Sequence, residues 1–312
     1  MKSFLKKLFA YLFIVVTVLC IILSYCFYDY QKTRVPQIKY NTFHNNFKNA
    51  DTMSIVLGTS HTFYGIDSKL LDGEVFNFAS ISQSLMEDYA ILKHIKNPIK
   101  RVVLPLSYFS NWHYLYTTQS DGEKLRTIDY QSTYNINYPK YLKRKDIMNL
   151  LSEVSKNPFK KASEDQFDNK GNLIGACDFD YKDITDAKTV FERHKMGKDF
   201  SKINPYLDSI TRFCDKNNIK LFIVVTPYTQ AYKNYTSAGG FDNYLNRIKI
   251  KYNINNCFVL DFRTYFKASD ESTMFRDADH LSICGRSAFT KYLNQQINTI
   301  SSTKNHTPQV SN

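Results

Sequence analysis

Residues that interrupt regular structure are scarce in this sequence. Of its 312 residues, 10 are glycine, 8 are proline and 1 is tryptophan. Such a composition excludes a collagen-like repeat and a low-complexity linker, and no repeat of solenoid period is visible. Hydrophobic residues make up 43% of the chain. The chain is therefore long enough to bury the core of one large domain or of two small ones.

Cysteine is present, but without the spacing of a metal site. The six cysteines include no C-x-x-C pair, so we expect no zinc site, and no motif indicates a nucleotide cofactor. Cys20 and Cys26 lie in or beside an apolar N-terminal run, where they would face lipid or pack. For the other four, a disulfide between two of them is open, and buried free thiols are the favoured interpretation. These four are Cys177, Cys214, Cys257 and Cys284.

One long uncharged run lies near the N-terminus, at residues 8–28. At ~1.5 Å per residue it reaches ~30 Å, enough to cross the hydrocarbon core of a bilayer. A cleaved signal peptide would have a shorter apolar core and small residues at the cleavage site. Here the run ends in bulky residues, and Tyr25 before Cys26 fits a lipoprotein signal poorly. We expect residues 1–30 to be an uncleaved single-pass anchor of the cell membrane.

Charges around this run indicate its orientation. Three lysines and the amino terminus precede it, while one acidic and two basic residues follow it closely. This bias favours a cytoplasmic N-terminus and an extracytoplasmic C-terminal domain. The formal net charge is +12, spread along the chain. Nucleic acid is a poor partner on that side of a membrane, whereas anionic lipid headgroups or an acidic envelope polymer fit the electrostatics. A basic surface that only keeps the domain soluble is the alternative.

Beyond the anchor, short apolar runs alternate with amphipathic segments. Residues 31–50 are polar and are expected to form a stalk, and residues 301–312 a disordered tail. Residues 51–300 predict an α/β domain with three α/β/α layers, in which helices cover both faces of a central parallel sheet. The expected strands are residues 53–58, 74–79, 101–107, 220–227 and 257–262, and the expected helices are residues 84–96, 240–252, 285–300 and one that begins at Pro205 after an Asn204 cap.

Residues 108–200 interrupt this alternation. They are rich in Tyr, Asn, Lys and Asp, which indicates an inserted cap subdomain over the carboxyl edge of the sheet. Functional sites of parallel sheets lie at that edge. Within the insertion, "DNKGNLIG" at residues 168–175 resembles a β-hairpin.

A candidate nucleophile follows the first expected strand in "IVLGTSHTFYGID", residues 55–67. The strand ends at Gly58, and Ser60 follows where the chain turns toward a helix. Ser60 is therefore expected at the carboxyl edge, near helix amides that can stabilise an oxyanion. A simple serine turn is the alternative reading of this pattern.

A serine nucleophile needs a base, and the base needs an orienting group. "MFRDADHLSICG", residues 274–285, places Asp277 and His280 about one turn apart, after the last strand and before the last helix. The Asp277 carboxylate can accept from one ring nitrogen of His280 while the other faces Ser60. Asp279 points elsewhere in most backbone conformations, so Asp277 is the expected partner.

Together these residues resemble the SGNH (GDSL-like) hydrolase superfamily. "GTSH" matches its nucleophile block and "DADHLSICG" its D-x-x-H block, over about residues 53–107 and 203–300. The chain looks most like the membrane-anchored branch related to the D-alanine transfer protein DltD and to polysaccharide O-acetyltransferases of the AlgX/AlgJ kind. The resemblance implies a three-layer α/β/α fold, acyl-ester chemistry through Ser60, His280 and Asp277, and a membrane-bound O-acyltransferase as partner.

The chain departs from the family pattern where oxyanion donors are expected. The glycine of the second block is replaced within "NFASISQSL", and the asparagine of the third block is missing after "VVLPLS". An atypical oxyanion hole is expected. Its candidate donors, with Gly58 of the nucleophile turn, are Ser80, Ser82, Gln83, Ser107 and Asn111.

Several further side chains are weaker candidates. His61, beside the nucleophile, would bind substrate or lie exposed in a turn. Trp112 lies among aromatic residues past the third strand and would stack on a sugar ring or pack the cap, and Tyr228 would line the cleft. The remaining histidines considered are expected to be ordinary, and these are His94, His113 and His194.

Three functions fit these observations. The first is an O-acyltransferase, acetyl being the expected group, that acts on a hydroxyl of an envelope glycan and is concentrated at the membrane by its anchor. The second is an esterase with the same triad, which differs only in whether water or a sugar hydroxyl reaches the acyl-enzyme. The third is a non-catalytic tether that binds glycan or assembles a complex.

Overall fold

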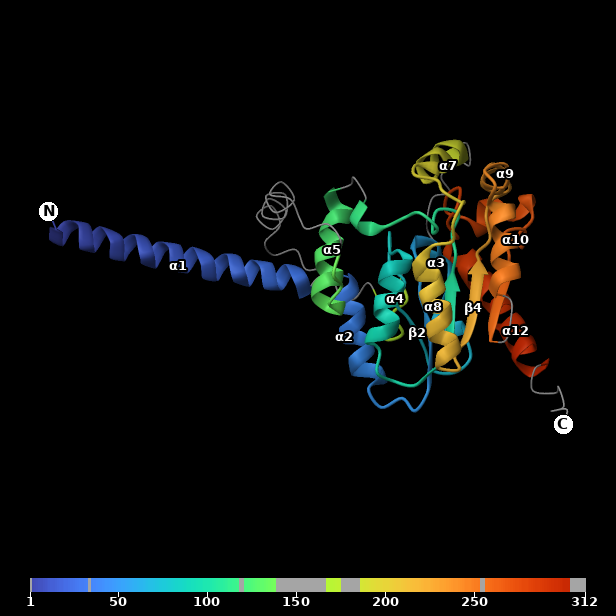
Figure 1. Cartoon of the computed structure of the whole chain (residues 1–312), viewed down its shortest axis with the longest axis horizontal. Coiled ribbons are helices and arrows are strands. Elements are labelled where there is room, and N and C mark those ends of the chain that lie inside the picture. Colours follow the sequence, from blue (N-terminus) through green and yellow to red (C-terminus); the bar gives the residue numbers. More distant parts are fainter. Residues whose placement is uncertain are drawn as a thin grey trace.

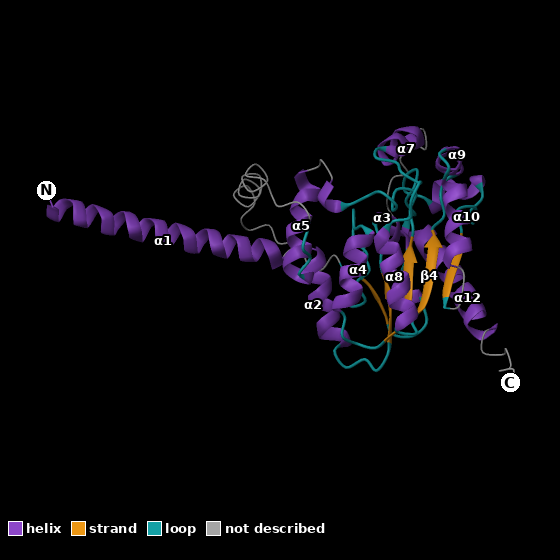
Figure 2. Ribbon diagram, in the orientation of Figure 1, coloured by secondary structure: helices purple, strands orange, loops and turns teal. Residues whose placement is uncertain are grey.

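The computed structural model describes residues 2–32, 35–117, 121–138, 167–174, 186–252 and 256–303. Its centre is a five-stranded sheet in the order β2-β1-β3-β4-β5. All neighbouring strands are parallel, so their carboxyl ends meet at one edge, which we call the rim (Figures 1 and 2). The strands are β1 (Met53–Val56), β2 (Val75–Asn77), β3 (Ile99–Pro105), β4 (Lys220–Val225) and β5 (Cys257–Asp261).

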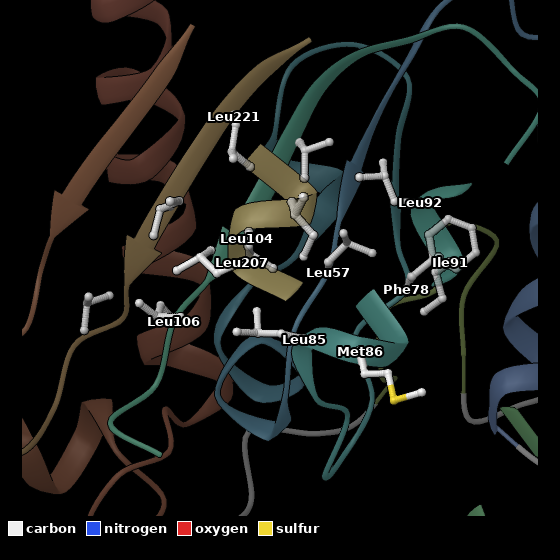
Figure 3. Packing of buried hydrophobic residues seen from close by; sticks show 14 of the residues in the cluster. Leu57, Phe78, Leu85, Met86, Ile91, Leu92, Leu104, Leu106, Leu207 and Leu221 are labelled. Carbon is white, nitrogen blue, oxygen red and sulfur yellow. The ribbon is translucent and has the colours of Figure 1, made fainter. Parts of the chain in front are cut away.

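Helices cover both faces of the sheet, as the sequence predicts. Alternate residues of a strand point to opposite faces, so Ile223 joins one buried cluster and Val224 the other. The Ile223 cluster, part of which Figure 3 shows, includes residues of α2 (Val35–Phe47), α4 (Leu85–His94), α8 (Pro205–Lys216) and α10 (Phe241–Tyr252). The Val224 cluster includes residues of α12 (Ile283–Thr303). The three-layer α/β/α class is confirmed.

Local sequence explains where two of these helices begin. The Ser84 side chain caps α4 and accepts from the Met86 amide. The Glu87 carboxylate accepts from the Ser84 amide, which completes a capping box. Helix α8 begins at Pro205, and the Asn204 side chain accepts from the Tyr206 amide. The predicted start of α8 is therefore confirmed.

The expected stalk is instead part of the domain. Residues 35–47 form helix α2, in which Ile38, Phe43 and Phe47 are buried. The rings of Phe43 and Phe47 lie 5.4 Å and 5.5 Å from the ring of Phe76 in β2. The stalk prediction fails because three apolar residues within a polar segment are enough to bury one side of a helix.

Helix α1 (Lys2–Lys32) extends away from the domain (Figure 1). Within it, Ser3–Tyr25 has a mean hydropathy of 2.6, and none of its most apolar window is buried. By length and composition this helix could cross a membrane. Cys20 is exposed on it, while the side chain of Cys26 lies outside the described part of the structure.

The described parts of the insertion lie in three places. Residues 167–174 run beside the edge of the sheet, where the Asn77 amide donates to the Lys170 carbonyl at 2.9 Å. Helix α7 (Ala187–Lys195) packs against α9 (Gln230–Ala238) near the rim. The other elements described in this region are η2 (Leu115–Thr117) and α5 (Asp121–Tyr134), which contact each other, and α5 also packs against α2.

The hairpin expected at residues 168–175 is reduced to a tight turn closed by one antiparallel bridge between Phe167 and Leu173. Residues 139–166 and 175–185 of the proposed cap, with Cys177, lie outside the described residues. The same holds for residues 304–312 of the expected tail, whereas 301–303 continue α12. The described residues also contain shorter helical elements, among them η1 (Ser68–Leu70), η5 (Ala268–Asp270) and α11 (Glu271–Met274).

Candidate active site

Ser60 lies at the rim because the chain turns sharply after β1. Gly58 adopts a φ of +116°, and a Cβ there would lie 2.3 Å from Thr62 Oγ1, so the position requires glycine. The Gly58 amide donates to Asp88 Oδ1 at 2.8 Å. Thr59 then caps the short helix α3 (Ser60–Gly65), and half-buried Ser60 is its first residue.

His280 lies at the rim on a tight loop between β5 and α12. The loop is closed by a hydrogen bond in which the Arg276 amide donates to the His280 carbonyl at 3.0 Å. Asp277 Oδ1 accepts from the amides of Asp279 and His280 at 3.2 Å and 2.8 Å, which is the local bonding that aspartate favours in turns. From α9's N-cap, Thr229 Oγ1 donates to the Ala278 carbonyl at 2.6 Å. The loop is therefore fixed by its own carboxylate and by a neighbouring helix.

The structure brings Ser60, His280 and Asp277 together. The distance from Ser60 Oγ to His280 Nε2 is 2.9 Å. On the other side of the ring, Nδ1 lies 2.9 Å and 3.1 Å from the two carboxylate oxygens of Asp277. Because a carboxylate only accepts, Nδ1–H donates to Asp277 and Nε2 is left to accept the Ser60 proton. This is the order of groups that a serine nucleophile requires.

A scan against protein-family models finds no match, and a search of the curated proteins finds no relative. The function of the chain must therefore be argued from its residues and their geometry.

Asp279 also faces His280, contrary to the expectation that it points elsewhere. Its Oδ1 lies 3.3 Å from His280 Nδ1, and its Oδ2 lies 2.7 Å from His61 Nε2. The Asp279 side chain is 1% exposed. The reason is the loop itself: because Asp277 binds the amides of residues 279 and 280, the chain turns so that both carboxylates meet one ring.

His61 is neither exposed nor open to a substrate. It is 2% exposed, and both ring nitrogens contact protein groups, since Nδ1 hydrogen-bonds to Ser107 Oγ and Nε2 to Asp279. Its ring centroid lies 4.9 Å from that of His280. The structure corrects the prediction of a substrate-binding or exposed turn histidine, because the first turn of α3 directs this side chain inward.

The pKa of His280 is raised and that of His61 is lowered, because carboxylate charge dominates at the first ring and burial at the second. Burial lowers the pKa of His280, but the charges of Asp279 and Asp277 outweigh this and raise it above its usual value. Burial lowers the pKa of His61, although Asp279 opposes the effect. For Asp279, His280 and His61 outweigh burial and hold its pKa well below the usual range. An ionised Asp279 beside a neutral His61 is the arrangement that follows.

Four of the six predicted oxyanion donors hydrogen-bond within the protein, namely Gly58, Gln83, Ser107 and Asn111. Gln83 is fully buried, donates to Asp88 Oδ1 at 2.6 Å and accepts from Tyr130. The Gly58 amide donates to the same Asp88 oxygen, and Ser107 Oγ contacts His61. These contacts correct the expectation that such groups face an acyl carbonyl.

Two serines remain from that set. The Ser80 amide donates to the Gly58 carbonyl at 3.2 Å, and its residue is 4% exposed. Ser82 is half-buried with a φ of +62°, and its carbonyl lies 3.0 Å from His113 Nε2. Ser82 is thus the more accessible of the two.

The aromatic candidates pack the domain. Trp112 donates from Nε1 to the His194 carbonyl at 3.1 Å, and its ring contacts Tyr108 and Phe200 edge-on. Tyr228 is 2% exposed. Tyr228 therefore does not line a cleft, and Trp112, which is half-buried, packs against its aromatic neighbours. Asn111 holds the end of the insertion, because its Oδ1 accepts from the Asn204 amide at 2.8 Å.

Sequence reasoning missed two residues near the site, the buried Asp88 and the half-buried His194. Asp88 joins the nucleophile turn to the Gln83 loop, and burial raises its pKa to about 7. Its spacing from Leu85 and Leu92 places it on the apolar side of α4, a signal readable in the sequence. His194, read as ordinary, lies 3.7 Å from Asp279 and 2.7 Å from the Tyr232 hydroxyl.

An aromatic ring and a cation lie beside the Ser60–His280 pair. The ring of Tyr64 meets the His280 ring edge-on at 5.3 Å, and the Arg276 guanidinium lies 4.3 Å from the Tyr64 centroid. Both residues are half-buried.

Among the described residues, His61, Asp279 and His280 form the one group of histidine, cysteine and acidic side chains with candidate ligand atoms within 4.8 Å of one another. These atoms bind one another, Ser107 and Asp277 through hydrogen bonds, so we treat the group as a hydrogen-bonded network.

Proposed function

We propose that this protein is a membrane-anchored serine O-acyltransferase. The observation that carries the proposal is the hydrogen-bonded chain from Ser60 through His280 to Asp277 at the rim of a parallel sheet. In the first step Ser60 Oγ bonds to the acyl carbonyl carbon while its proton passes to His280 Nε2. His280 then gives that proton to the leaving group as its bond to the acyl carbon breaks, which leaves an acyl-serine.

In the second step an acceptor hydroxyl attacks the acyl-serine. His280 takes the acceptor's proton and returns it to Ser60 Oγ as the ester bond to serine breaks. Asp277 holds the ring and stabilises the imidazolium formed in both steps. The acceptor that we propose is a hydroxyl of an envelope glycan and the acyl group is acetyl, with a membrane-bound O-acyltransferase as donor partner.

Transfer is favoured over hydrolysis by the apolar helix α1. A helix of this length and composition would hold the domain at a membrane surface, where the effective concentration of a membrane-linked donor or acceptor is high. Orientation with the domain outside the cell is part of the proposal, because the envelope polymer lies there. An esterase with the same triad is the second candidate, and the hydrogen-bonded chain of Ser60, His280 and Asp277 supports both equally.

The first test is covalent labelling of Ser60. Full-length protein in detergent micelles, incubated with 4-nitrophenyl acetate, should gain the mass of one acetyl group on Ser60. Ser60→Ala should lose this labelling, whereas Ser209→Ala, which removes an exposed hydroxyl on α8, should retain it. Equal labelling of the wild type and Ser60→Ala would contradict both enzymatic functions and leave the non-catalytic tether.

A second measurement separates transfer from hydrolysis. An oligosaccharide acceptor should divert acetyl from water to sugar hydroxyls, and in cells Ser60→Ala should abolish acylation of the envelope polymer at unchanged protein level. Acetate release that the acceptor leaves unaffected would favour the esterase.

A further inference from the structure

A second serine and a second histidine lie behind the proposed catalytic groups. Ser107 Oγ contacts His61 Nδ1, and His61 Nε2 lies 2.7 Å from Asp279 Oδ2. Ser107 is 1% exposed, and the side chains of His61 and Asp279 are each 1% exposed. Such burial of three polar groups is costly unless they satisfy one another. Ser107, His61 and Asp279 therefore form a buried hydrogen-bonded group that no substrate can reach.

The direction of the hydrogen bonds among Ser107, His61 and Asp279 follows from the charge of Asp279. Ionised Asp279 can only accept, so His61 Nε2–H donates to it. A neutral His61 then accepts at Nδ1, and Ser107 O–H must donate there. Thr59 Oγ1 lies 3.3 Å from Ser107 Oγ and can supply the bond that Ser107 accepts. All donors thus point toward Asp279.

Asp279 also contacts His280 and so links the buried hydrogen bonds to the proposed base. Its second oxygen, Oδ1, lies 3.3 Å from His280 Nδ1, the atom that also lies 2.9 Å from Asp277 Oδ1. The Nδ1–H group is therefore shared between two carboxylates. Asp277 is the more exposed of the two, with a side-chain exposure of 33% against 1%, so the buried charge is less screened by water.

The surroundings of His280 include other ionisable groups. Arg276, on the same loop, opposes protonation, and Tyr64 and His61 of α3 contact the ring. Behind Asp279 stand three further groups, which are His194 of α7, Tyr232 of α9 and Tyr228 before α9.

We propose that Asp279 is a second positioning carboxylate of His280, held against Nδ1 by the buried pair His61 and Ser107. This inference deepens the proposed acyl transfer, on which its catalytic meaning rests. When Ser60 gives its proton to His280, the new positive charge lies between Asp277 and Asp279. His61, the sequence neighbour of the nucleophile, thereby acts on the reaction through the position of Asp279.

The test is a titration of His280 that needs no substrate. Full-length protein with ¹⁵N-labelled histidine, in detergent micelles, is followed by NMR from pH 5 to 9, and the His280 signal is identified by its absence in His280→Asn. Asp279→Asn keeps the side-chain shape and removes the charge. We expect it to lower the pKa of His280 by about one unit or more, the usual effect of an adjacent opposite charge.

A matched pair at His61 tests the holding role. His61→Gln keeps an N–H donor near the Nε2 position, so Asp279→Asn should have its full effect in this background. His61→Leu removes the donor, and the pKa of His280 should fall in this variant even with Asp279 present. In His61→Leu, the further shift caused by Asp279→Asn should shrink to less than about half.

Each outcome decides between the alternatives. An unchanged His280 titration in Asp279→Asn, or an undiminished Asp279→Asn effect in His61→Leu, would overturn the proposal. If Asp279→Asn does not fold, as judged by Trp112 fluorescence, the His61 pair decides: a pKa that His61→Leu leaves unchanged or raises would refute the holding role. The titration involves no acyl group and is therefore independent of the labelling test. Failure of acetyl labelling at Ser60 would contradict the proposed function, while the expected shifts in the pKa of His280 would still support this inference.

Discussion

Lys39 shows how much one residue can differ from its usual environment. This lysine of α2 is 1% exposed, and its ammonium donates to the Asn77 and Ala79 carbonyls at 3.0 Å and 2.5 Å. The rings of Phe63 and Phe167 lie 5.1 Å from Nζ, within reach of cation–π attraction. Burial lowers its pKa to about 7, with Asp168 opposing. The buried amine therefore changes charge near neutral pH.

The pKa of Lys39 predicts how stability depends on pH. In the unfolded chain lysine titrates near its usual value, so between pH 7 and 9 the unfolded state binds more protons than the folded state. The free energy of unfolding therefore rises with pH, by at most about 1.4 kcal/mol per pH unit from this group. Lys39→Met should remove that part of the slope.

Urea unfolding of the full chain in micelles, followed by the fluorescence of Trp112 at pH 7, 8 and 9, measures the slope. Lys233→Met, at a partly exposed position of α9, is the control and should keep the wild-type slope. Equal slopes in wild type and Lys39→Met would show that Lys39 does not lose its proton in the folded protein.

Residue-scale chemistry also sets the limit of sequence prediction at the site. Ser60, His280 and Asp277 could be chosen because parallel strands end at one edge and D-x-x-H spacing spans one turn. The roles of Asp279 and His61 could not, since the direction of a side chain in a tight loop depends on the bonds of its backbone. Here those bonds are the two that Asp277 makes to amides.

At the scale of elements, the cap of α8 joins the insertion to the sheet domain. Asn204 accepts from the Tyr206 amide, donates from its own amide to Asn111 Oδ1 at 2.8 Å and from its side chain to the Asn111 carbonyl at 3.0 Å. The residue is 2% exposed. One side chain therefore both starts a helix and fixes the segment that precedes it.

Asn204→Ala should lower the free energy of unfolding by about 2 kcal/mol, because it removes a helix cap and leaves the Asn111 carbonyl without this buried donor. Ser209→Ala, at a partly exposed position on the same helix, should change it by less than about 0.5 kcal/mol. Chemical denaturation of the two variants under identical conditions checks the difference. Similar losses in both would mean that the cap does not anchor α8.

The elements themselves differ in how well sequence predicts them. The apolar runs of β3 and β4 are continuous, so their strands were expected within two residues of the observed ends. Helix α2 was missed because its buried positions include a lysine and a proline, which periodicity methods count as polar or helix-breaking. The course of residues 167–174 along the sheet edge depends on tertiary contacts with Asn77, which no local pattern contains.

At the scale of the whole molecule, α1 is the one described helix that is long and apolar enough to span a bilayer. Its apolar side chains are exposed, which costs free energy in water and is favourable in lipid. The protein should stay with the membrane fraction after alkaline carbonate washing. A Val15→Arg variant, with a charge at mid-helix, should be retained less, since insertion then costs about 2.5–3.5 kcal/mol more.

The orientation is tested by adding protease outside intact cells. Digestion of the domain in intact cells, with protection of the N-terminal segment, is expected; digestion only after lysis would reverse the proposed orientation. Release of the wild-type chain by carbonate would contradict membrane spanning itself.

The separation of Ser60 and His280 along the chain has a consequence for biosynthesis. Ser60 is synthesised early, whereas His280 follows 220 residues later. His280 lies shortly before α12, which covers one face of the sheet. A nascent chain that has not yet been extended to residue 280 therefore carries the serine but not the imidazole that it contacts in the folded domain. The reactivity proposed for Ser60 therefore requires synthesis to have passed His280, and we expect chains that are terminated before that residue not to consume acyl donors.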